Sequence, residues 1–479
     1  MGETRRIRQC PENRHSQRLE CHAERPRANP QRRQTGDNPV SDPIERSRTA
    51  LSRSELSSPM QHLMNFGFLD GSHSLFDYGC GRGDDLRLLG DLKIRAAGWD
   101  PVFHPKGKRR SADIVNLGFV LNVIEDASER RETLKSAFAL ARKALIVSVM
   151  LGYQSKREQF QAYQDGVRTR RNTFQKYFAQ DEFRTYIEET LETNAVPIAP
   201  GICLVFRNPV DEQLFLLARQ EVRREWRLMR REPNSEAIAA LVEEHRAQVD
   251  AYWLKALELG RPATPAECPE MTSLIRLVGS KRRVHEWVER FFDPQEMEAA
   301  AIGRQEDLLV YFALGHFGKR KPYSELPERL QRDVRIFFGS ITKARAAGKR
   351  ALFAVGDQQR LTEAALFCHQ QLGIGLLHQR HDLTFHQSLL GECLPLIRIY
   401  VGCALQLFGD ATSVDLIKVH LESGKVTFLV YDDFEGEQTP KLVERIKVDL
   451  PRLRVDFFDY VGEYEPVPLE EERANFYLR

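Results

Sequence analysis

The residues best suited to chemistry lie in one short segment, LFDYGCGRGDDLR, residues 75–87. An apolar run leads into Asp77, after which Gly79, Gly81 and Gly83 alternate with larger residues ahead of two aspartates. Glycine has no Cβ and tolerates positive φ, so a turn of this kind lets a ligand approach the backbone closely. The N–H groups at the start of the next helix attract oxygen atoms. The segment therefore predicts a strand, a glycine-rich turn and a helix that together bind a ligand.

An acid follows this turn at an informative distance. Asp100, followed by Pro101, ends the short apolar segment AAGW about 20 residues further on, the separation at which a βαβ unit places an acid on a ribose. The glycine spacing is GxGxG rather than the GxGxxG of dinucleotide sites, and Asp77 stands shortly before the first glycine. Together these features favour a ligand site over an ordinary tight turn.

Length and composition bound the class of protein. The 479 residues, of which 42% are hydrophobic and 29% charged, predict two or three domains with real cores. A net charge of +2 neither demands nor excludes a polyanionic partner. The sequence has no apolar run near the roughly 20 residues of a membrane span, and its first residues lack the apolar core of a secretory signal. We therefore expect a cytoplasmic protein without a membrane partner.

The cysteines predict no metal or disulfide chemistry. All 8 are scattered and none forms a CxxC pair, so neither a zinc site nor a disulfide framework is expected, and we assign no metal site. Cys80 alone lies where chemistry could occur, inside the glycine turn. We expect it to pack as a small side chain beside a cofactor rather than to act as a nucleophile.

Changes in composition divide the chain into four regions. Residues 1–45 are rich in Arg, Gln, Asn and Pro and are predicted to form a disordered tail. Residues 46–208 contain the glycine turn, and residues 209–270 are predicted to be a charged helical connector with RQEVRREWRLMRRE as its densest part. Residues 271–479 are predicted to form a C-terminal helical and α+β domain of unknown role, with a strand-like ALFAVGD between helices and hairpins near the end.

The acid followed by GxGxG, with Asp100 beyond it, resembles the first motif of the class I S-adenosylmethionine-dependent methyltransferases over about residues 75–208. The resemblance implies an α/β, Rossmann-like sheet and S-adenosylmethionine as the cofactor. Only about a dozen residues separate Asp100 from Asp113, so we expect a shortened sheet that lacks one crossover between its second and fourth strands. The acid that usually meets the adenine amino group would be missing with it.

The family pattern also implies roles for individual residues. The three glycines would let the turn approach the methionine part of the cofactor, Asp77 would support that part, and Asp100 would accept the ribose hydroxyls. The end of the strand near Asn116 would border the transferred methyl group. The cofactor-binding residues implied in this way are Asp77, Tyr78, Gly79, Cys80, Gly81, Gly83, Asp100, Pro101, Asn116, Leu117 and Phe119.

Longer segments give a closer resemblance. LSRSELSSPM, ADIVNLGFVLNVIEDASER and RRNTFQKYF, with DLLVYFALGHF, LPERLQRDVRIFFGS and DLIKVHLESGKVTFLVYDDF in the C-terminal half, resemble the DNA phosphorothioation-associated methyltransferase family. The likeness runs from about Arg46 to the C-terminus. It implies a methyltransferase that acts near bacterial DNA modification or defence, with DNA or proteins of a phosphorothioation system as partners. The oligomeric state is not assigned by the sequence.

The methyl acceptor is not assigned either. DNA amino-methyltransferases carry a (D/N)PPY-type motif where this chain has NLGF, and the sequence lacks the Pro-Cys dipeptide of cytosine-5 enzymes, so standard base methylation is disfavoured. The candidates for substrate-side catalytic groups are Asn122, Tyr153, Lys176 and Tyr177. Two other interpretations stay open: a cofactor-binding, non-catalytic module of a DNA-modification complex, and a methyltransferase for RNA or a small molecule.

Overall fold

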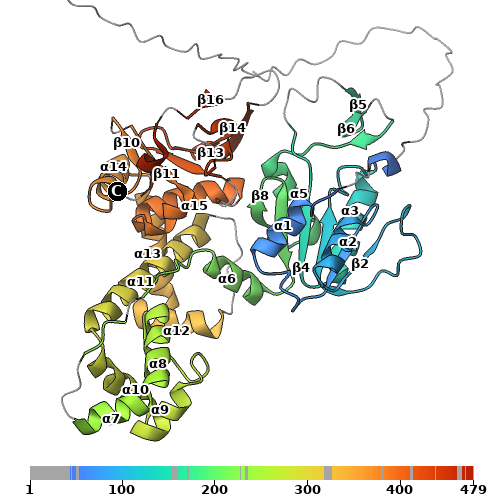
Figure 1. The fold of residues 1–479 in the computed structure, drawn as a ribbon. Helices are drawn as coiled ribbons and strands as arrows, with labels where there is room; N and C mark the ends of the chain where they lie inside the picture. The colour runs from blue at the N-terminus through green and yellow to red at the C-terminus, as the bar shows by residue number, and fades with distance from the viewer. Residues whose placement is uncertain are drawn as a thin grey trace, which may run out of the picture. The chain divides into compact units, whose positions relative to one another are not determined.

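The computed structural model describes residues 44–477, apart from positions 45, 50–52, 153–159, 170–171, 227, 232–235, 318–325, 380, 410, 412–413, 437–438, 461–466 and 470. The Arg-rich tail that the sequence predicts to be disordered lies outside the described residues. Residues Ile44–Arg479 group into one unit. Figure 1 shows the helices and strands along the chain.

The first sheet has the strand order β2-β1-β3-β4-β9-β8. The four strands β1 to β4 are parallel to one another, whereas β9 is antiparallel to both β4 and β8. This is the predicted Rossmann-like methyltransferase sheet without its third strand, because the chain passes from β2 to β3 with no helix or strand between them. The strands are β1 (Leu75–Tyr78), β2 (Ala96–Trp99), β3 (Ala112–Gly118), β4 (Ala141–Ser148), β8 (Val196–Ala199) and β9 (Ile202–Phe206).

Helices cover both faces of this sheet (Figure 1). Leucines of α1 and α2 pack on the face of the sheet that contains Ile114 and Ile146. A leucine of α3, together with aromatic and aliphatic residues of α5, packs on the other face, which contains Val115 and Leu145. Alternation of buried residues along each strand allows one sheet to bury both faces. The elements are η1 (Arg46–Thr49), α1 (Ser58–Asn65), α2 (Asp84–Asp91), α3 (Ala127–Leu140), α5 (Gln180–Leu191) and α6 (Pro209–Ala218).

A small antiparallel sheet follows β4. Its strands are β5 (Gln161–Tyr163), β6 (Gly166–Arg168) and β7 (Phe174–Gln175). The turn between β5 and β6 is anchored by Asp165, which accepts hydrogen bonds from both terminal nitrogens of the buried Arg130 on α3, at 2.7 and 3.0 Å. The polar segment after β4 is thereby attached to the helix that follows β3.

Helices dominate the middle of the chain, with two departures from the sequence prediction. The described residues among 219–231 are not helical, although the charge density of this segment predicts a helix, and Arg224 there binds Asp307 on α11 at 2.9 Å. The strand-like ALFAVGD is the last turn of α13 and the bend after it. The helices are α7 (Glu236–Glu244), α8 (Arg246–Leu259), α9 (Met271–Val278), α10 (Lys281–Val288), α11 (Pro294–Phe317), α12 (Glu328–Phe337), α13 (Ile341–Ala354), α14 (Gln358–Gln370) and α15 (Pro395–Phe408), with η2 (Glu289–Phe291).

The chain ends in an antiparallel sheet of order β10-β11-β12-β13-β14-β15, with β16 paired to β14. Its hairpins agree with the predicted period of 2, and α14 and α15 pack on one face through a shared core with Ile417, Phe428 and Ile446. No described helix is both long and apolar enough to cross a membrane. The elements are β10 (Leu376–His378), β11 (Asp382–His386), η3 (Gln387–Glu392), β12 (Leu416–His420), β13 (Lys425–Asp432), β14 (Lys441–Asp449), β15 (Arg454–Asp459), β16 (Val467–Pro468) and η5 (Arg473–Phe476).

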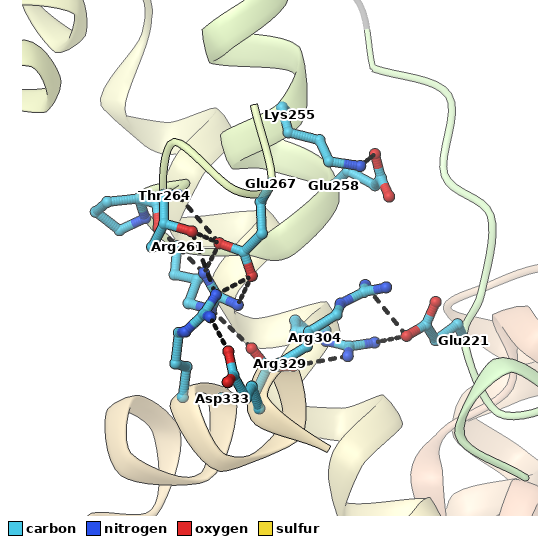
Figure 2. A network of polar contacts seen from close by, with 12 residues as sticks. Glu221, Lys255, Glu258, Arg261, Thr264, Glu267, Arg304, Arg329 and Asp333 are labelled. Carbon is cyan, nitrogen blue, oxygen red and sulfur yellow. Dashed lines mark hydrogen bonds and ion pairs between the residues drawn. The ribbon is translucent and has the colours of Figure 1, made fainter. Parts of the chain in front are cut away.

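A buried ion network joins the helices of the middle region (Figure 2). Asp333 of α12 has a fully buried side chain, and its two oxygens bind Arg261 after α8 at 2.7 Å and Arg304 of α11 at 2.8 Å. Each arginine also forms an ion pair with a second acid: Arg261 binds Glu267 at 2.8 Å, and Arg304 binds Glu221 at 2.7 Å. Each desolvated charge is therefore matched by an opposite charge.

Replacing Asp333 tests this network. Asp333→Asn should lower the free energy of unfolding by about 3 to 5 kcal/mol, because it leaves two buried guanidinium groups without their shared carboxylate. The half-exposed pair of Lys255 and Glu258 in the same region, at 2.7 Å, supplies the control, and Glu258→Gln should change stability by less than about 1 kcal/mol. Urea unfolding of both variants measures the difference, and equal effects would contradict the prediction.

Candidate functional site

A cavity of about 600 Å³ opens at the carboxyl ends of β1, β2 and β3. Its walls include the end residues of these strands, Tyr78, Trp99 and Gly118, together with the glycine loop after β1. The carboxyl edge of parallel strands is where open α/β sheets place their ligands. The cavity therefore lies where the sequence predicts a site.

The glycine loop turns back over the ends of the strands. Gly79 and Gly81 have φ values of 86° and 53°, in the left-handed region that glycine adopts most readily. A Cβ at Gly79 would also clash with the side chain of Val120. The N–H groups of Gly79 and Cys80 donate to the carbonyl oxygen of Trp99, at 2.8 and 3.2 Å. Glycine is thus required both by the backbone conformation and by the space at the start of the loop.

Asp100 is fixed beside this loop by three backbone donors. Its Oδ2 accepts from the N–H of Gly81 at 3.1 Å, and its Oδ1 accepts from the N–H groups of Val102 and Phe103 at 2.9 Å each. These bonds orient a carboxylate on the wall of the cavity. Carboxylate oxygens have further lone pairs, so this group can still accept a hydrogen bond from a ligand hydroxyl.

Asp77 and Asn116 form a buried polar pair on neighbouring strands. Asn116 Nδ2 donates to Asp77 Oδ1 at 2.8 Å, and burial raises the pKa of Asp77 to about 7. The Oδ1 of Asn116 is buried and has no hydrogen-bond partner among the described residues. Both residues line the cavity. An unmatched amide oxygen beside a carboxyl group is suited to a ligand that carries N–H donors or positive charge.

The segment before β1 covers one side of the cavity. Arg46 binds Glu125 at 2.8 Å and Glu129 on α3 at 2.6 Å. Further along, the backbone N–H of Arg53 donates to Asp84 at 2.8 Å, and its guanidinium carbon lies 5.8 Å from the ring centroid of Phe119. Arg46 and Arg53 both line the cavity. The sequence did not single out Arg46, whose role depends on acids about 80 residues away in the chain.

Most residues implied by the family resemblance lie on the cavity wall. Gly83 and Leu117 are the exceptions: Gly83 precedes α2 with a φ of 83°, and Leu117 is fully buried in the core of the sheet. Burial raises the pKa of the Cys80 thiol to about 12, so this side chain is neutral. The cavity brings together Asp77, Tyr78, Gly79, Cys80, Gly81, Asp100, Pro101, Asn116 and Phe119.

The candidate catalytic groups lie elsewhere. Asn122 is buried and uses its amide on backbone groups, donating to the Lys176 oxygen at 2.6 Å and accepting from the Met150 N–H at 3.0 Å. Lys176 binds Asp165 at 3.2 Å and Glu182 at 2.9 Å. Burial raises the pKa of Tyr177. None of these three candidates lines the cavity, and Tyr153 lies outside the described residues.

Cationic and aromatic side chains that the sequence did not indicate also border the site. The guanidinium carbon of Arg109 lies 3.8 Å from the ring centroid of Trp99, and that of Arg82 lies 5.2 Å from the ring of Phe103. All four line the cavity. Arg82 belongs to the glycine turn itself, and Arg109 belongs to the basic run after Asp100, whose direction depends on the chain's return to β3. No metal-binding cluster of three or more His, Cys, Asp or Glu occurs among the residues described.

No protein-family model matches the chain, and no curated protein matches it significantly. Magnesium protoporphyrin IX methyltransferase from Synechocystis PCC 6803 is 11% identical, with 34% of this chain and 93% of that chain covered and a TM-score of 0.23. A SAM-dependent methyltransferase from Aquifex aeolicus is 16% identical, with coverage of 34% and 95% and a TM-score of 0.23. At this level the similarities carry no functional argument, so the fold assignment rests on strand order and register.

The raised pKa of Asp77 predicts a specific dependence of stability on pH. The unfolded chain loses this proton near the ordinary pKa of 3.8, but the folded chain keeps it until about 7, so stability falls as pH rises between these values. Asp77→Asn should remove this loss while keeping an acceptor for Asn116. Between the ordinary pKa of 3.8 and the raised pKa of about 7, the free energy of unfolding of the variant minus that of the parent should rise by up to about 1.4 kcal/mol per pH unit. Above pH 7 this difference should level off.

Chemical unfolding at a series of pH values measures this difference. Asp91→Asn, at an exposed position on α2, is the matched control for loss of an aspartate. A stability difference for Asp77→Asn that is constant across the range would show that burial does not hold the Asp77 proton.

Proposed function

We propose that this chain is a methyltransferase that uses S-adenosylmethionine. The observation that carries the proposal is the arrangement of the glycine loop, Asp77 and Asp100 around one cavity at the carboxyl edge of a shortened methyltransferase-type sheet. When bound, the cofactor supplies an electrophilic methyl group on a sulfonium. The chain would then have to hold the cofactor, orient the acceptor and exclude water.

The polar groups of the cavity fit the parts of this cofactor. The carboxylate of Asp100 suits the ribose hydroxyls, because two hydroxyl donors need acceptors. The unmatched oxygen of Asn116 and the carboxyl group of Asp77 suit the amino group and the positive charge of the methionine part. The absence of a Cβ at Gly79 lets the side chain of Val120, which also lines the cavity, pack directly against the loop.

The remaining task of the chain is positioning. Methyl transfer in line with a leaving sulfur is accelerated chiefly by holding the reacting atoms in near-attack geometry. Arg46 lines the cavity, and its ion pairs with Glu125 and with Glu129 of α3 would help to hold the cavity wall in place. Glu132 and Ser136 of α3 extend the wall beyond the loop, where an acceptor would lie.

The acceptor is proposed to be an oxygen, nitrogen or sulfur atom in or near modified DNA. Support for this context is the sequence resemblance to the phosphorothioation-associated family, and the lack of a (D/N)PPY motif argues against standard base methylation. A second candidate function is a cofactor-binding module without catalysis. It is favoured by the full hydrogen bonding of Asn122 and the ion pairs of Lys176, which leave these groups committed to the fold.

Cofactor binding tests the proposal directly. Calorimetric titration of S-adenosylmethionine into the full chain should show binding that Asp100→Ala weakens by about 10- to 100-fold, the effect of losing charge-assisted hydrogen bonds. Gly81→Val should abolish binding because a β-branched residue cannot adopt the positive φ. Gly90→Ala, in α2 with open space around it, is the matched control and should bind as the parent does. Lack of binding by the parent chain would refute the proposal.

Transfer is tested separately from binding. A radiolabelled methyl group should appear on one class of acceptor when phosphorothioated DNA, unmodified DNA, RNA and partner proteins are compared. Labelling of phosphorothioated DNA or of a partner protein would support the proposed context. Labelling of RNA alone would contradict the DNA-modification context and indicate an RNA methyltransferase. Tight cofactor binding with no labelled product would favour the non-catalytic module.

A further inference from the structure

One stretch of the C-terminal half differs sharply in charge from the rest of the chain. The sequence has 68 acidic residues among 479, yet residues 334–356 contain none. The same stretch carries five cations, Arg335, Lys343, Arg345, Lys349 and Arg350. It covers the end of α12, the following turn and all of α13.

The two helices are joined by a tight turn. Gly339 has a φ of 77° and allows the chain to reverse within the turn. Ser340 then caps α13, because its hydroxyl oxygen accepts the N–H of Lys343 at 3.3 Å. A short, glycine-containing turn also joins the two helices of the helix-turn-helix motif, whose second helix enters the major groove of DNA.

The inner sides of these helices are fixed to α11. Leu330 and Val334 of α12 and Ala344 of α13 share a core with Leu308 of α11. A Cβ at Gly348 would lie 2.7 Å from the backbone of α11, so α13 packs very closely there. Asp333, on the same buried side of α12 as Leu330 and Val334, binds Arg304 of α11 in the buried ion network of Figure 2. The outward face of α13 is therefore held in a single orientation.

That outward face is cationic, and on it Lys349 Nζ lies 5.9 Å from the ring centroid of Phe353. Lys343, Ala346, Lys349, Arg350 and Phe353 are exposed at the spacing of one helix face, and Phe353 keeps 72% of its surface accessible. None of the five cations of this stretch forms an ion pair with any residue that the structure describes. Exposed cations elsewhere in the chain form ion pairs with acids. Arg282 on α10, for example, binds Glu286 at 2.8 Å.

Two acids lie near this face. Asp357 after α13 binds Arg360 at 3.3 Å, and Glu306 of α11 lines the hollow between α11 and α13, where burial raises its pKa. The five cations of this stretch therefore outnumber the two acids near the face. The face keeps a positive potential that attracts a polyanion.

We propose that α12 and α13 form a duplex DNA-binding element, with the outward face of α13 in the major groove. The groove is about 12 Å wide and admits one α-helix, and the 14 residues of α13 span about 21 Å. The cations are spread along the helix, as a line of phosphates requires, rather than around one pocket. The small side chain of Ala346 at the centre of the face permits close approach to the base edges. This inference is independent of methyl transfer.

Titration with duplex DNA tests whether α12 and α13 bind DNA. Fluorescence anisotropy with a labelled random-sequence duplex and the full chain, without cofactor, should show binding that weakens steeply with salt. The double variant Lys349→Gln, Arg350→Gln should bind at least about tenfold more weakly, and the slope of log affinity against log salt should fall by about two. The matched control, Arg282→Gln with Arg283→Gln on α10, removes the same charge and should leave affinity within about twofold.

A single exposed position separates a DNA surface from a folding effect. Ala346→Lys should strengthen DNA binding and Ala346→Glu should weaken it, with unfolding temperatures unchanged, because both residues are good helix formers. Equal losses from the α10 and α13 double variants would overturn the proposal, as would a lack of DNA binding at low salt. Binding of polyglutamate or of anionic lipid vesicles in place of DNA, with the same response at Ala346, would likewise overturn it and assign the face to an acidic protein or a membrane surface.

Discussion

One backbone acceptor, the carbonyl oxygen of Trp99, holds the proposed cofactor loop to the sheet. It accepts the N–H groups of both Gly79 and Cys80 at the point where β1 and β2 end side by side, with Tyr78 paired to Trp99. Because the next residue is Asp100, the same register also places a carboxylate against the N–H of Gly81. The geometry of the cavity thus follows from the pairing of two short strands and from a loop that only glycine can form.

Local and near-local features of this site could be predicted from the sequence. Asp77, the glycine spacing and the distance to Asp100 are properties of a single βαβ unit, whose structure depends on few contacts between residues far apart in the sequence. Counting residues between Asp100 and Asp113 sufficed to predict the missing crossover, since so short a connection cannot contain a helix and a strand. The roles of individual residues in binding the cofactor stay predictions, although most of the proposed set shares one cavity wall.

Features that depend on distant partners could not be predicted in this way. Residues 219–231 have the charge density of an exposed helix, but Arg224 and Glu221 bind Asp307 and Arg304 on α11, more than 80 residues later. Lys176 likewise has an amino group of the kind that catalysis can use, yet in the structure this group forms ion pairs with Asp165 and Glu182. Residue type alone does not reveal which polar groups are already engaged.

The chain uses its cations in two physically different ways. In the interior, Arg261 and Arg304 share Asp333, because a desolvated charge without a partner would cost several kcal/mol. On α13 the lysines and arginines are solvated, so folding neither requires nor rewards an acid beside them. Stability therefore does not explain why an entire helix and the turn before it lack acids in a chain that is otherwise nearly neutral. A surface that keeps a net positive potential for an external anion does explain it.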